Sequence, residues 1–262
     1  MGFSGDADGN GSCHRRFIMI RQKAKVERND LNGNSVSNRI LCSISEAEFQ
    51  QLQPCLEFVE IPQRRFLHQR SKRMNAVYFI NNGVASLIIT GKRGRSVEVG
   101  IVGCEGLTGM PLVAGVHRPS YSAIMQIEGS AFRMKDTAFE AGMKSLSDLR
   151  DRVLRYSVIH AMQIAQTAAC NRLHDAGQRL ARWLLMSRDR INTDIVRLTH
   201  DFMATMLGTD RPSVTIAAAH LQRLGAIEYG RKALRIVNRK LLERATCECY
   251  FAVRRYNPAV GL

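Results

Sequence analysis

The stretch LTHDFMATMLGTDRPSVTIAAAHLQRLG, from Leu198 to Gly225, contains two short apolar patterns separated by one glycine. Thr199 is a good N-cap for the first pattern, which predicts a helix of about two turns with one apolar face: Phe202, Met203, Met206 and Leu207. Gly208 follows where a left-handed or strained turn needs glycine. The second pattern predicts another helix, with its own apolar face: Val214, Ala217, Ala218 and Leu221. We therefore expect a helix–turn–helix.

The first turn of the second helix is polar and basic, although a helix made only for core packing does not need such a turn. Arg211, Ser213 and Thr215 fall away from its apolar face. An exposed polar helix start after a tight turn is typical of the device that reads the DNA major groove. A purely structural helical hairpin stays open as the alternative. Pro212 biases its predecessor towards extended geometry, so we predict Arg211 at the cap and regular helix from Pro212.

The charge of the chain favours a polyanionic partner. Its 262 residues carry a formal net charge of +15 and a pI near 10.0. Between Thr199 and Lys240 there are seven Lys or Arg against three Asp or Glu. Such an excess promotes binding to phosphates through counterion release, although a generally basic, solvated surface has the same composition.

Helical periodicity also dominates the chain before this stretch. Residues 137–171 predict one long helix, and residues 176–191 a second helix in which Trp183 lies in the core. A four–three repeat on the long helix predicts a seam with a second helix: Leu154, Val158, Ala161, Ala165 and Ala168. A neighbouring stripe of Leu146, Leu149 and Val153 is expected to face the preceding domain. Packing only within its own chain is the alternative for the long helix.

Residues 57–135 predict β structure. Asn81-Asn82-Gly83 predicts a hairpin, Gly91 to Gly94 another turn, and Glu128-Gly129 a third break between strands. Many short strands with tight turns favour an antiparallel roll or barrel. Two capping boxes, Ser43 with Glu46 or Ser45 with Glu48, are consistent with a short helix before the strands. Near the C-terminus, residues 229–232 separate two short β-type runs and predict a hairpin.

The sequence contains seven scattered cysteines and lacks three common enzyme motifs. There is no P-loop, H-E-x-x-H or G-x-S-x-G, so we predict that the protein is not an enzyme. An odd cysteine count without a C-x2-C pair favours a reducing compartment. We interpret Cys247 and Cys249 as two thiols of a terminal segment, with a redox or metal-binding role as the alternative, and we predict no metal site. No apolar run suits a signal peptide or a membrane span, so we expect a cytoplasmic protein without membrane contact.

Three segments together resemble one known family. LTHDFMATMLGTDRPSVTIAAAHLQRLGAIEYGRKALRIVN is similar to the winged helix–turn–helix of the Crp/Fnr transcription regulators, and NAVYFINNGVASLI and GIVGCEGLTGMPLV resemble parts of that family's cyclic-nucleotide-binding-type β-roll. The resemblance covers roughly residues 39–250, in the family's order. It implies an α+β fold in which a jelly-roll-like antiparallel β-roll precedes a long dimerisation helix and a winged helix–turn–helix. The expected divisions are a flexible leader (1–38), a β-roll sensor (39–136), the long helix (137–171), the DNA-binding domain (172–245) and a tail (246–262).

The resemblance further implies a homodimer that binds double-stranded DNA. RNA polymerase is a candidate partner of this homodimer. Arg211 matches the arginine that opens the recognition helix and that can contact guanine O6 and N7. By the same resemblance, His200 would meet the DNA backbone and wing residues Arg231 and Lys232 would lie near flanking phosphates. The full DNA-binding set is Thr199, His200, Thr209, Asp210, Arg211, Pro212, Ser213, Thr215, Arg231 and Lys232. Pro212 and Ile216 depart from the best-known member's pattern, which predicts a different base code.

The effector site departs from the family pattern as well. The family's nucleotide-binding members use a Gly-Glu pair for the ribose and an Arg-Ser pair for the cyclic phosphate, whereas here Leu107 follows Gly106 and Pro119 follows Arg118. We therefore expect no cAMP, and either another small effector or none, at a pocket of Gly106, Leu107, Arg118, Ser120 and Ser122. Isolated Cys13, Cys42 and Cys55 do not support an iron–sulfur cluster. Isolated His68, His117 and His160 give no support for haem. The alternative function is a ligand-gated regulatory protein whose helix–turn–helix is structural or binds protein.

Overall fold

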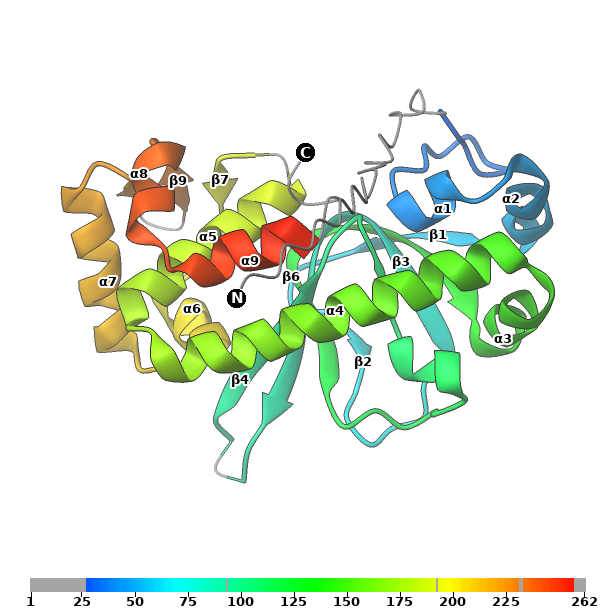
Figure 1. Ribbon diagram of the computed structural model, residues 1–262, viewed down its shortest axis with the longest axis horizontal. Helices are drawn as coiled ribbons and strands as arrows, with labels where there is room; N and C mark the ends of the chain where they lie inside the picture. The colour runs from blue at the N-terminus through cyan, green and yellow to red at the C-terminus, as the bar shows by residue number, and fades with distance from the viewer. Residues whose placement is uncertain (1–26, 93, 192, 231–232, 257–262) are drawn as a thin grey trace, which may run out of the picture.

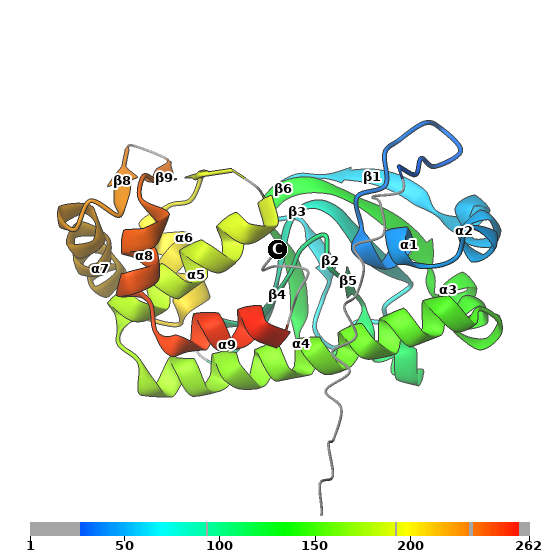
Figure 2. The same ribbon diagram turned by 45° about the horizontal axis from the view of Figure 1, so that its top comes forward.

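The computed structural model describes residues 27–92, 94–191, 193–230 and 233–256. A sheet lobe and a helical lobe lie side by side, and the long helix α4 (Ser147–Leu173) runs along both of them (Figures 1 and 2). The order of the elements, with a sheet before helices, confirms the predicted α+β fold. None of the helices in the described ranges combines the length and the apolar character needed to span a bilayer.

One antiparallel sheet of six strands forms the first lobe. Its main order is β1-β6-β3-β4, while β2 pairs with β6 and β5 pairs with β3. The strands are β1 (Glu57–Ile61), β2 (Phe66–His68), β3 (Ala76–Thr90), β4 (Ser96–Val102), β5 (Leu107–Thr108) and β6 (Ser122–Lys135). The predicted turn at Gly91 is correct, because Gly94 donates to the Gly91 carbonyl at 3.1 Å between β3 and β4.

The two other predicted breaks are wrong. Both glycine-containing sites lie inside continuous strands, because β3 and β6 pair on either side of them and the register shifts between Ile80 and Ala85. Gly83 has φ +83°, and a Cβ at Gly129 would lie 2.2 Å from the Asn82 carbonyl oxygen. Glycine at these positions lets the two strands approach closely at a bulge, which uses the same residue type that a hairpin uses.

Short helices close the open ends of the sheet around a buried apolar core. They are α1 (Arg39–Ser43), α2 (Glu46–Leu52), α3 (Asp136–Ser145) and the 3-10 turns η1 (Gln53–Cys55) and η2 (Met110–Ala114). The core contains fully buried Phe49, Phe79 and Phe132. Residues 27–38, expected in the flexible leader, belong to this lobe. Arg28 is buried and its guanidinium donates to the carbonyls of Leu41 and Ile44. The remaining leader residues lie outside the described part of the chain.

The segment 137–171, expected as one helix, forms two, since Leu146 adopts an extended backbone between α3 and α4. The Glu48 carboxylate on α2 accepts hydrogen bonds from the backbone N–H groups of Asp148 and Leu149, both at 2.9 Å. An acidic side chain from another helix thus caps α4. The predicted capping box is not formed, because Ser45 precedes α2 but makes no side-chain cap bond.

Helix α4 has three faces with different neighbours. Leu149, Val153 and Tyr156 belong to the core of the sheet lobe, and with Leu146 they confirm the predicted sheet-facing stripe. A second face lies along α9 (Glu248–Tyr256). The third face is exposed, and it contains all five residues of the predicted seam: Leu154, Val158, Ala161, Ala165 and Ala168.

The helical lobe is built around α5 (Ala176–Ile191), in which Trp183 is buried as predicted. Around it lie α6 (His200–Leu207), α7 (Arg211–Arg223), α8 (Arg239–Ala245) and a small sheet of β7 (Ile195–Val196), β8 (Ile227–Tyr229) and β9 (Leu234–Ile236). The expected tail is wrong over residues 248–256, which form α9. Tyr250 on α9 is fully buried, and its hydroxyl donates to Asp189 on α5 at 2.7 Å.

The two lobes share a continuous interface. Apolar residues of the strands, including Val84 and Ile101, pack in one cluster with α5 and α6. Within this interface the Arg190 guanidinium on α5 pairs with Glu105 at 2.8 Å, with side-chain exposures of 0% and 3%. Arg190 also donates to Gln163 on α4 at 3.0 Å. One buried arginine therefore joins the sheet lobe, the long helix and the helical lobe.

A second buried group in the interface is Glu98 on β4. Trp183 Nε1 donates to Glu98 Oε1 at 3.1 Å, and Ser86 Oγ lies 2.6 Å from Glu98 Oε2 and 2.5 Å from Gln126 Oε1. The single hydroxyl hydrogen of Ser86 can go to only one of these oxygens. If it goes to Gln126, Glu98 donates its own proton to Ser86. Burial raises the pKa of Glu98 to about 7, which favours this neutral form.

Stability is expected to depend on the protonation of Glu98. The pKa of Glu98 rises from 4.5 to about 7 on folding, so the folded state binds the proton more tightly. This contribution is fully present below pH 4.5 and is lost as the pH rises through 7. The loss is of the order of 3 kcal/mol at about 1.4 kcal/mol per pKa unit. Glu98→Gln, which keeps the neutral shape, should flatten the dependence of the unfolding free energy on pH between these values. Denaturant titrations of both proteins at several pH values between 4.5 and 7 measure this. An equal change of the unfolding free energy with pH in the two proteins would contradict the prediction.

Candidate nucleic-acid interface

Helix α6 and the turn after it form as the sequence predicts. Thr199 Oγ1 accepts a hydrogen bond from the Phe202 N–H at 3.2 Å, so Thr199 is the N-cap. Gly208 ends the helix in the left-handed region, with φ +60° and ψ +35°. Ala204 is small and buried, and the Thr209 N–H donates to its carbonyl oxygen at 3.0 Å. The tight turn thus depends on one glycine and on one small residue.

Helix α7 begins one residue earlier than predicted. Asp210 is the N-cap, and its carboxylate accepts a hydrogen bond from the Ser213 N–H at 2.7 Å. Arg211 is therefore the first residue of the helix instead of its cap. This backbone hydrogen bond lowers the pKa of Asp210. Aspartate is a stronger N-cap than arginine, which explains why Asp210 takes this position. Pro212 is tolerated at the second helical position, because a backbone N–H there would have no partner within the helix.

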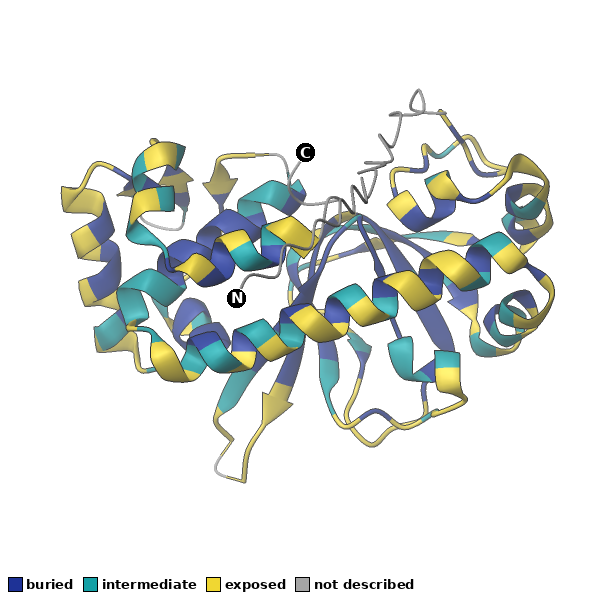
Figure 3. Cartoon of the chain, viewed as in Figure 1, coloured by how far each residue is buried: buried dark blue, intermediate teal, exposed yellow. Residues whose placement is uncertain are grey.

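The outer face of α7 is open to solvent at the edge of the molecule (Figure 3). The predicted apolar residues Val214, Ala217, Ala218 and Leu221 are buried against the rest of the lobe. Arg211 and Thr215 are exposed, and Ile216 is 70% exposed. Arg211 has one close acidic neighbour, Asp201 at 3.5 Å, in a solvated pair of little strength. The guanidinium is therefore available to an external partner.

His200 connects three elements of this interface. Its Nδ1 lies 3.0 Å from Thr215 Oγ1 on α7, and its ring centroid lies 4.4 Å from that of Tyr229 on β8. Burial, followed by the positive charge of Arg211, lowers the pKa of His200, which favours the neutral ring. The structure thus gives the imidazole a positioning role between α6, α7 and the small sheet. Contact of His200 with a DNA backbone stays a prediction.

The predicted C-terminal hairpin is present as β8 and β9, and β7 adds a third strand that the sequence analysis did not predict. Ile227 pairs with Ile236 and Tyr229 with Leu234 across the hairpin. The Tyr229 hydroxyl donates to the Leu198 carbonyl at 3.2 Å, which fixes the hairpin beside α6. Arg231 and Lys232, predicted at the tip of this wing, lie outside the described residues.

A helix–turn–helix followed by a small antiparallel sheet agrees with the model of the Crp-like helix-turn-helix domain, which matches residues 178–245. Residues 178–245 are a Crp-like helix-turn-helix domain. This domain contains α6, α7 and the hairpin described above, with most of α5 and α8. Among curated proteins, none matches this sequence.

Most of the chain shares its fold with solved structures that include regulators of the Crp/Fnr family. FixK2 from Bradyrhizobium japonicum aligns with a TM-score of 0.63 at 15% identity, over 73% of this chain and 98% of FixK2. A CRP-family transcriptional regulator from Thermus thermophilus gives a TM-score of 0.61 at 18% identity, over 71% and 95% of the two chains. The c-di-GMP-responsive global regulator CLP from Xanthomonas campestris gives 0.60 at 15% identity, over 73% and 99%.

The residues of the predicted effector pocket have separate neighbours. Gly106 lies against Tyr156 on α4, since a Cβ on this glycine would be 2.0 Å from the tyrosine ring. Leu107 is fully buried. Exposed Arg118 donates to the Ser71 carbonyl at 3.0 Å. Ser120 is exposed, and Ser122 on β6 accepts a hydrogen bond from the Arg70 N–H at 2.9 Å.

Glu105, on the other side of Gly106, is occupied by Arg190 of the neighbouring lobe. The space beside this glycine is therefore filled by protein side chains.

The structure also brings together Cys170, His174, Cys247 and Cys249, of which the sequence analysis considered only the last two as a pair. Two local signals were present, a cysteine and a histidine four residues apart at a helix end, and a C-x-C pair. The sequence analysis did not identify the Cys170 and His174 spacing, and only the tertiary structure brings it next to the C-x-C pair. Cys13 lies outside the described residues. The three isolated histidines have separate environments; for example, His68 bonds Thr108, and His160 stacks on Tyr156.

Gly208→Ala is expected to weaken the Crp-like domain for two separable reasons. The left-handed backbone costs a residue with a Cβ about 1–2 kcal/mol. In addition, the new Cβ would lie 2.7 Å from Val97 Cγ2 on β4. The double variant Gly208→Ala/Val97→Ala should therefore recover the second part of the loss. Unfolding free energies of the two single variants and the double variant measure the coupling. Additive losses would show that the turn does not contact Val97.

Proposed function

We propose that this protein is a dimeric, sequence-specific DNA-binding transcription regulator. The observation that carries the proposal is the free outer face of α7, the second helix of the Crp-like domain, which presents Arg211 and Thr215 to solvent. In a helix–turn–helix protein this surface enters the major groove, where an arginine can donate two hydrogen bonds to guanine. The net charge of +15 supports a polyanionic partner.

Within this proposal Arg211 is the main base-reading residue. Thr215 shares its hydroxyl with the Arg211 carbonyl at 3.0 Å and with His200, so it reaches a base edge or phosphate through its remaining lone pair. Thr199, Thr209 and Ser213 lie at the two helix starts, where backbone N–H groups and hydroxyls commonly contact phosphate. Exposed Ile216 offers an apolar surface for a thymine methyl group.

A homodimer through α4 is the second part of the proposal. The five seam residues lie in one stripe along the helix, and all are exposed in the single chain, with Val158 61% exposed. An apolar stripe at this spacing packs well against a second copy of the same helix. A two-fold axis along α4 would present two copies of α7 to half-sites one helical turn apart or a multiple of it.

The contacts around Gly106 support a regulator that does not bind cAMP. Leu107 replaces the ribose carboxylate of the family pattern, and Glu105 is held in the buried ion pair with Arg190. Tyr156 fills the space beside the glycine. An effector, if the protein uses one, would belong to another chemical class or bind elsewhere.

Loss of Arg211 is expected to reduce selectivity more than general affinity. Arg211→Ala should remove about 1–3 kcal/mol of discrimination between a selected site and random DNA. Sites selected from a random library, followed by titration over a salt series, provide the measurement. Arg223→Ala, at the other end of α7, is the matched control, which removes the same charge and should keep the selectivity. Equal binding of the selected site and of random DNA by the wild type would reject the regulator and favour a structural or protein-binding helix–turn–helix.

Charges placed in the seam of α4 are expected to give monomers. Ala161→Glu/Ala165→Glu introduces two carboxylates into the apolar stripe, which the dimer would have to bury. Light scattering should then give half the mass of the wild type. Arg152→Glu changes the net charge by the same amount outside the predicted seam and should stay dimeric. Monomeric wild type, or a dimeric double variant, would contradict the proposed interface.

A further inference from the structure

Four potential metal ligands meet where the long helix ends. Cys170 and His174 lie at the C-terminal end of α4, and Cys247 and Cys249 flank the start of α9. Their sulfur and nitrogen atoms all lie within 4.8 Å of one another. The three cysteines are buried, at 0%, 2% and 1% exposure, and form a cluster of their own. The His174 side chain is 12% exposed, which gives the group one side open to solvent.

The spacing of these atoms fits a single tetrahedral ion. Zinc bonds of about 2.3 Å to sulfur and about 2.0–2.1 Å to nitrogen imply ligand separations of roughly 3.8 Å for two sulfurs and roughly 3.6 Å for sulfur and nitrogen. Cys170 Sγ lies 3.6 Å from Cys247 Sγ, and Cys249 Sγ lies 3.6 Å from His174 Nδ1. The geometry is therefore close to that of a bound ion, with small movements needed for the other pairs.

We propose that Cys170, His174, Cys247 and Cys249 bind one zinc ion that joins α4 to α9. Three thiolates and an imidazole make a closed structural site of the kind zinc occupies, and soft sulfur ligands disfavour magnesium and calcium. His174 would bind through Nδ1, because its Nε2 lies 3.1 Å from the Glu248 carboxylate. A carboxylate behind a ligating histidine orients the ring and increases its basicity. Gln166 donates a hydrogen bond to Cys249 Sγ at 3.0 Å and thereby positions this second ligand.

Two other uses of these cysteines fit the arrangement less well. A Cys170–Cys247 disulfide would leave Cys249 and His174 without a reason to converge on the same point. In an iron–sulfur cluster the four protein ligands are shared among two or more irons. They would therefore stand farther apart than ligands of one ion, whereas here all four atoms are mutual neighbours.

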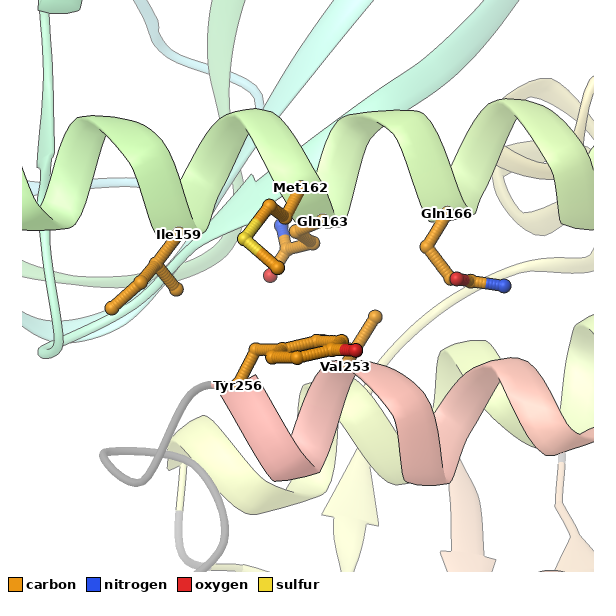
Figure 4. Close-up of a pocket in the computed structure, with 6 residues that line it drawn as sticks. All are labelled: Ile159, Met162, Gln163, Gln166, Val253 and Tyr256. Atoms are coloured by element: carbon orange, nitrogen blue, oxygen red, sulfur yellow. The ribbon is translucent and has the colours of Figure 1, made fainter.

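The site would control how the helical lobe is held on the long helix. His174 is the C-cap of α4 and lies two residues before the start of α5, so the ion would sit at the connection between these helices. Elsewhere α9 contacts α4 through a small mixed surface around a cavity of about 10 Å³, lined by Ile159, Met162, Gln163, Gln166, Val253 and Tyr256 (Figure 4). Met162 on this surface remains 39% exposed. An ion that binds both segments would add a strong local constraint.

Metal content tests the proposal without any use of DNA. The full chain, purified with reductant and equilibrated with zinc, should retain one zinc per chain after gel filtration, measured by mass spectrometry of the elements. Cys247→Ser/Cys249→Ser and His174→Ala should lose it. His174→Cys should retain it, since four thiolates also form a closed zinc site. Cys55→Ser, which changes an exposed cysteine outside the group, is the matched control and should retain full occupancy.

Cobalt substitution and a change at Glu248 extend this test. Cobalt(II) in the wild type should give the intense visible absorption of a tetrahedral thiolate site, and Cys55→Ser should give the same spectrum. Glu248→Gln should weaken zinc binding by about 10- to 100-fold, as expected for a partner of a ligating histidine. Circular dichroism establishes that each variant is folded. If a ligand variant is unfolded, the Glu248→Gln titration and the wild-type cobalt spectrum decide whether the metal binds at this site.

Chelation of the zinc-loaded protein tests the structural consequence. Amide hydrogen exchange over α9 and residues 170–176 should accelerate when zinc is removed, while exchange in the sheet lobe should change little. Less than stoichiometric zinc in the wild type, equal zinc in wild type and ligand variants, or a Cys170–Cys247 disulfide under these conditions would each overturn the proposed site. Unchanged exchange in α9 on chelation would overturn its role as a constraint. None of these outcomes depends on whether the protein binds DNA.

Discussion

The buried ion pair between Arg190 and Glu105 is the contact on which the relation of the two lobes depends. The arginine on α5 and the glutamate of the sheet lobe are almost completely excluded from solvent, and Gln163 of α4 accepts a further hydrogen bond from the same guanidinium. Removing one partner of such a pair leaves an uncompensated buried charge, which typically costs about 3–5 kcal/mol. The buried arginine and its two partners therefore hold the lobes together within the apolar interface.

The same contact lies beside Gly106, in the predicted effector pocket. Glu105 precedes Gly106 instead of following it, and its carboxylate is used inside the protein in the ion pair with Arg190. Tyr156 and Arg190 occupy the two sides of the segment, and both come from helices that follow the sheet in the chain. A movement of the segment around Gly106 would displace side chains of α4 and α5, because both helices contact it. Packed side chains thus join the two lobes at this segment.

Helix α4 is the element that every proposed function shares. One face completes the core of the sheet lobe, a second holds α9, and the third leaves an apolar stripe exposed along its length. Its N-terminus is capped by Glu48 from α2, and its C-terminus carries Cys170 and His174. The proposed dimer seam and the lobe contacts therefore lie along one helix, and the proposed zinc site lies at its C-terminal end. The orientation of α4 relative to α5 determines where α7 is presented.

Local patterns in the sequence determined the helix–turn–helix, the exposed apolar stripe on the long helix and the turn at Gly91. In each of these the deciding contacts join residues close together in the chain, such as Thr199 with Phe202, or repeat along one helix face. Capping and periodicity are therefore visible without the fold. The same local character explains the small error at Arg211, since Asp210 and Arg211 both suit a position before Pro212 and one hydrogen bond to Ser213 decides between them.

Only the tertiary structure decided the features that depend on distant partners. Gly83 and Gly129 lie at a bulge where β3 and β6 approach closely, and not in turns, because each strand finds its partner across the break. Arg28 and Glu48 gain their roles from carbonyl and N–H groups far along the chain. The cysteines near the C-terminus meet Cys170 and His174 only because α9 folds back on α4. A glycine, a carboxylate or a thiol has several uses of similar local energy, and the long-range neighbours select among them.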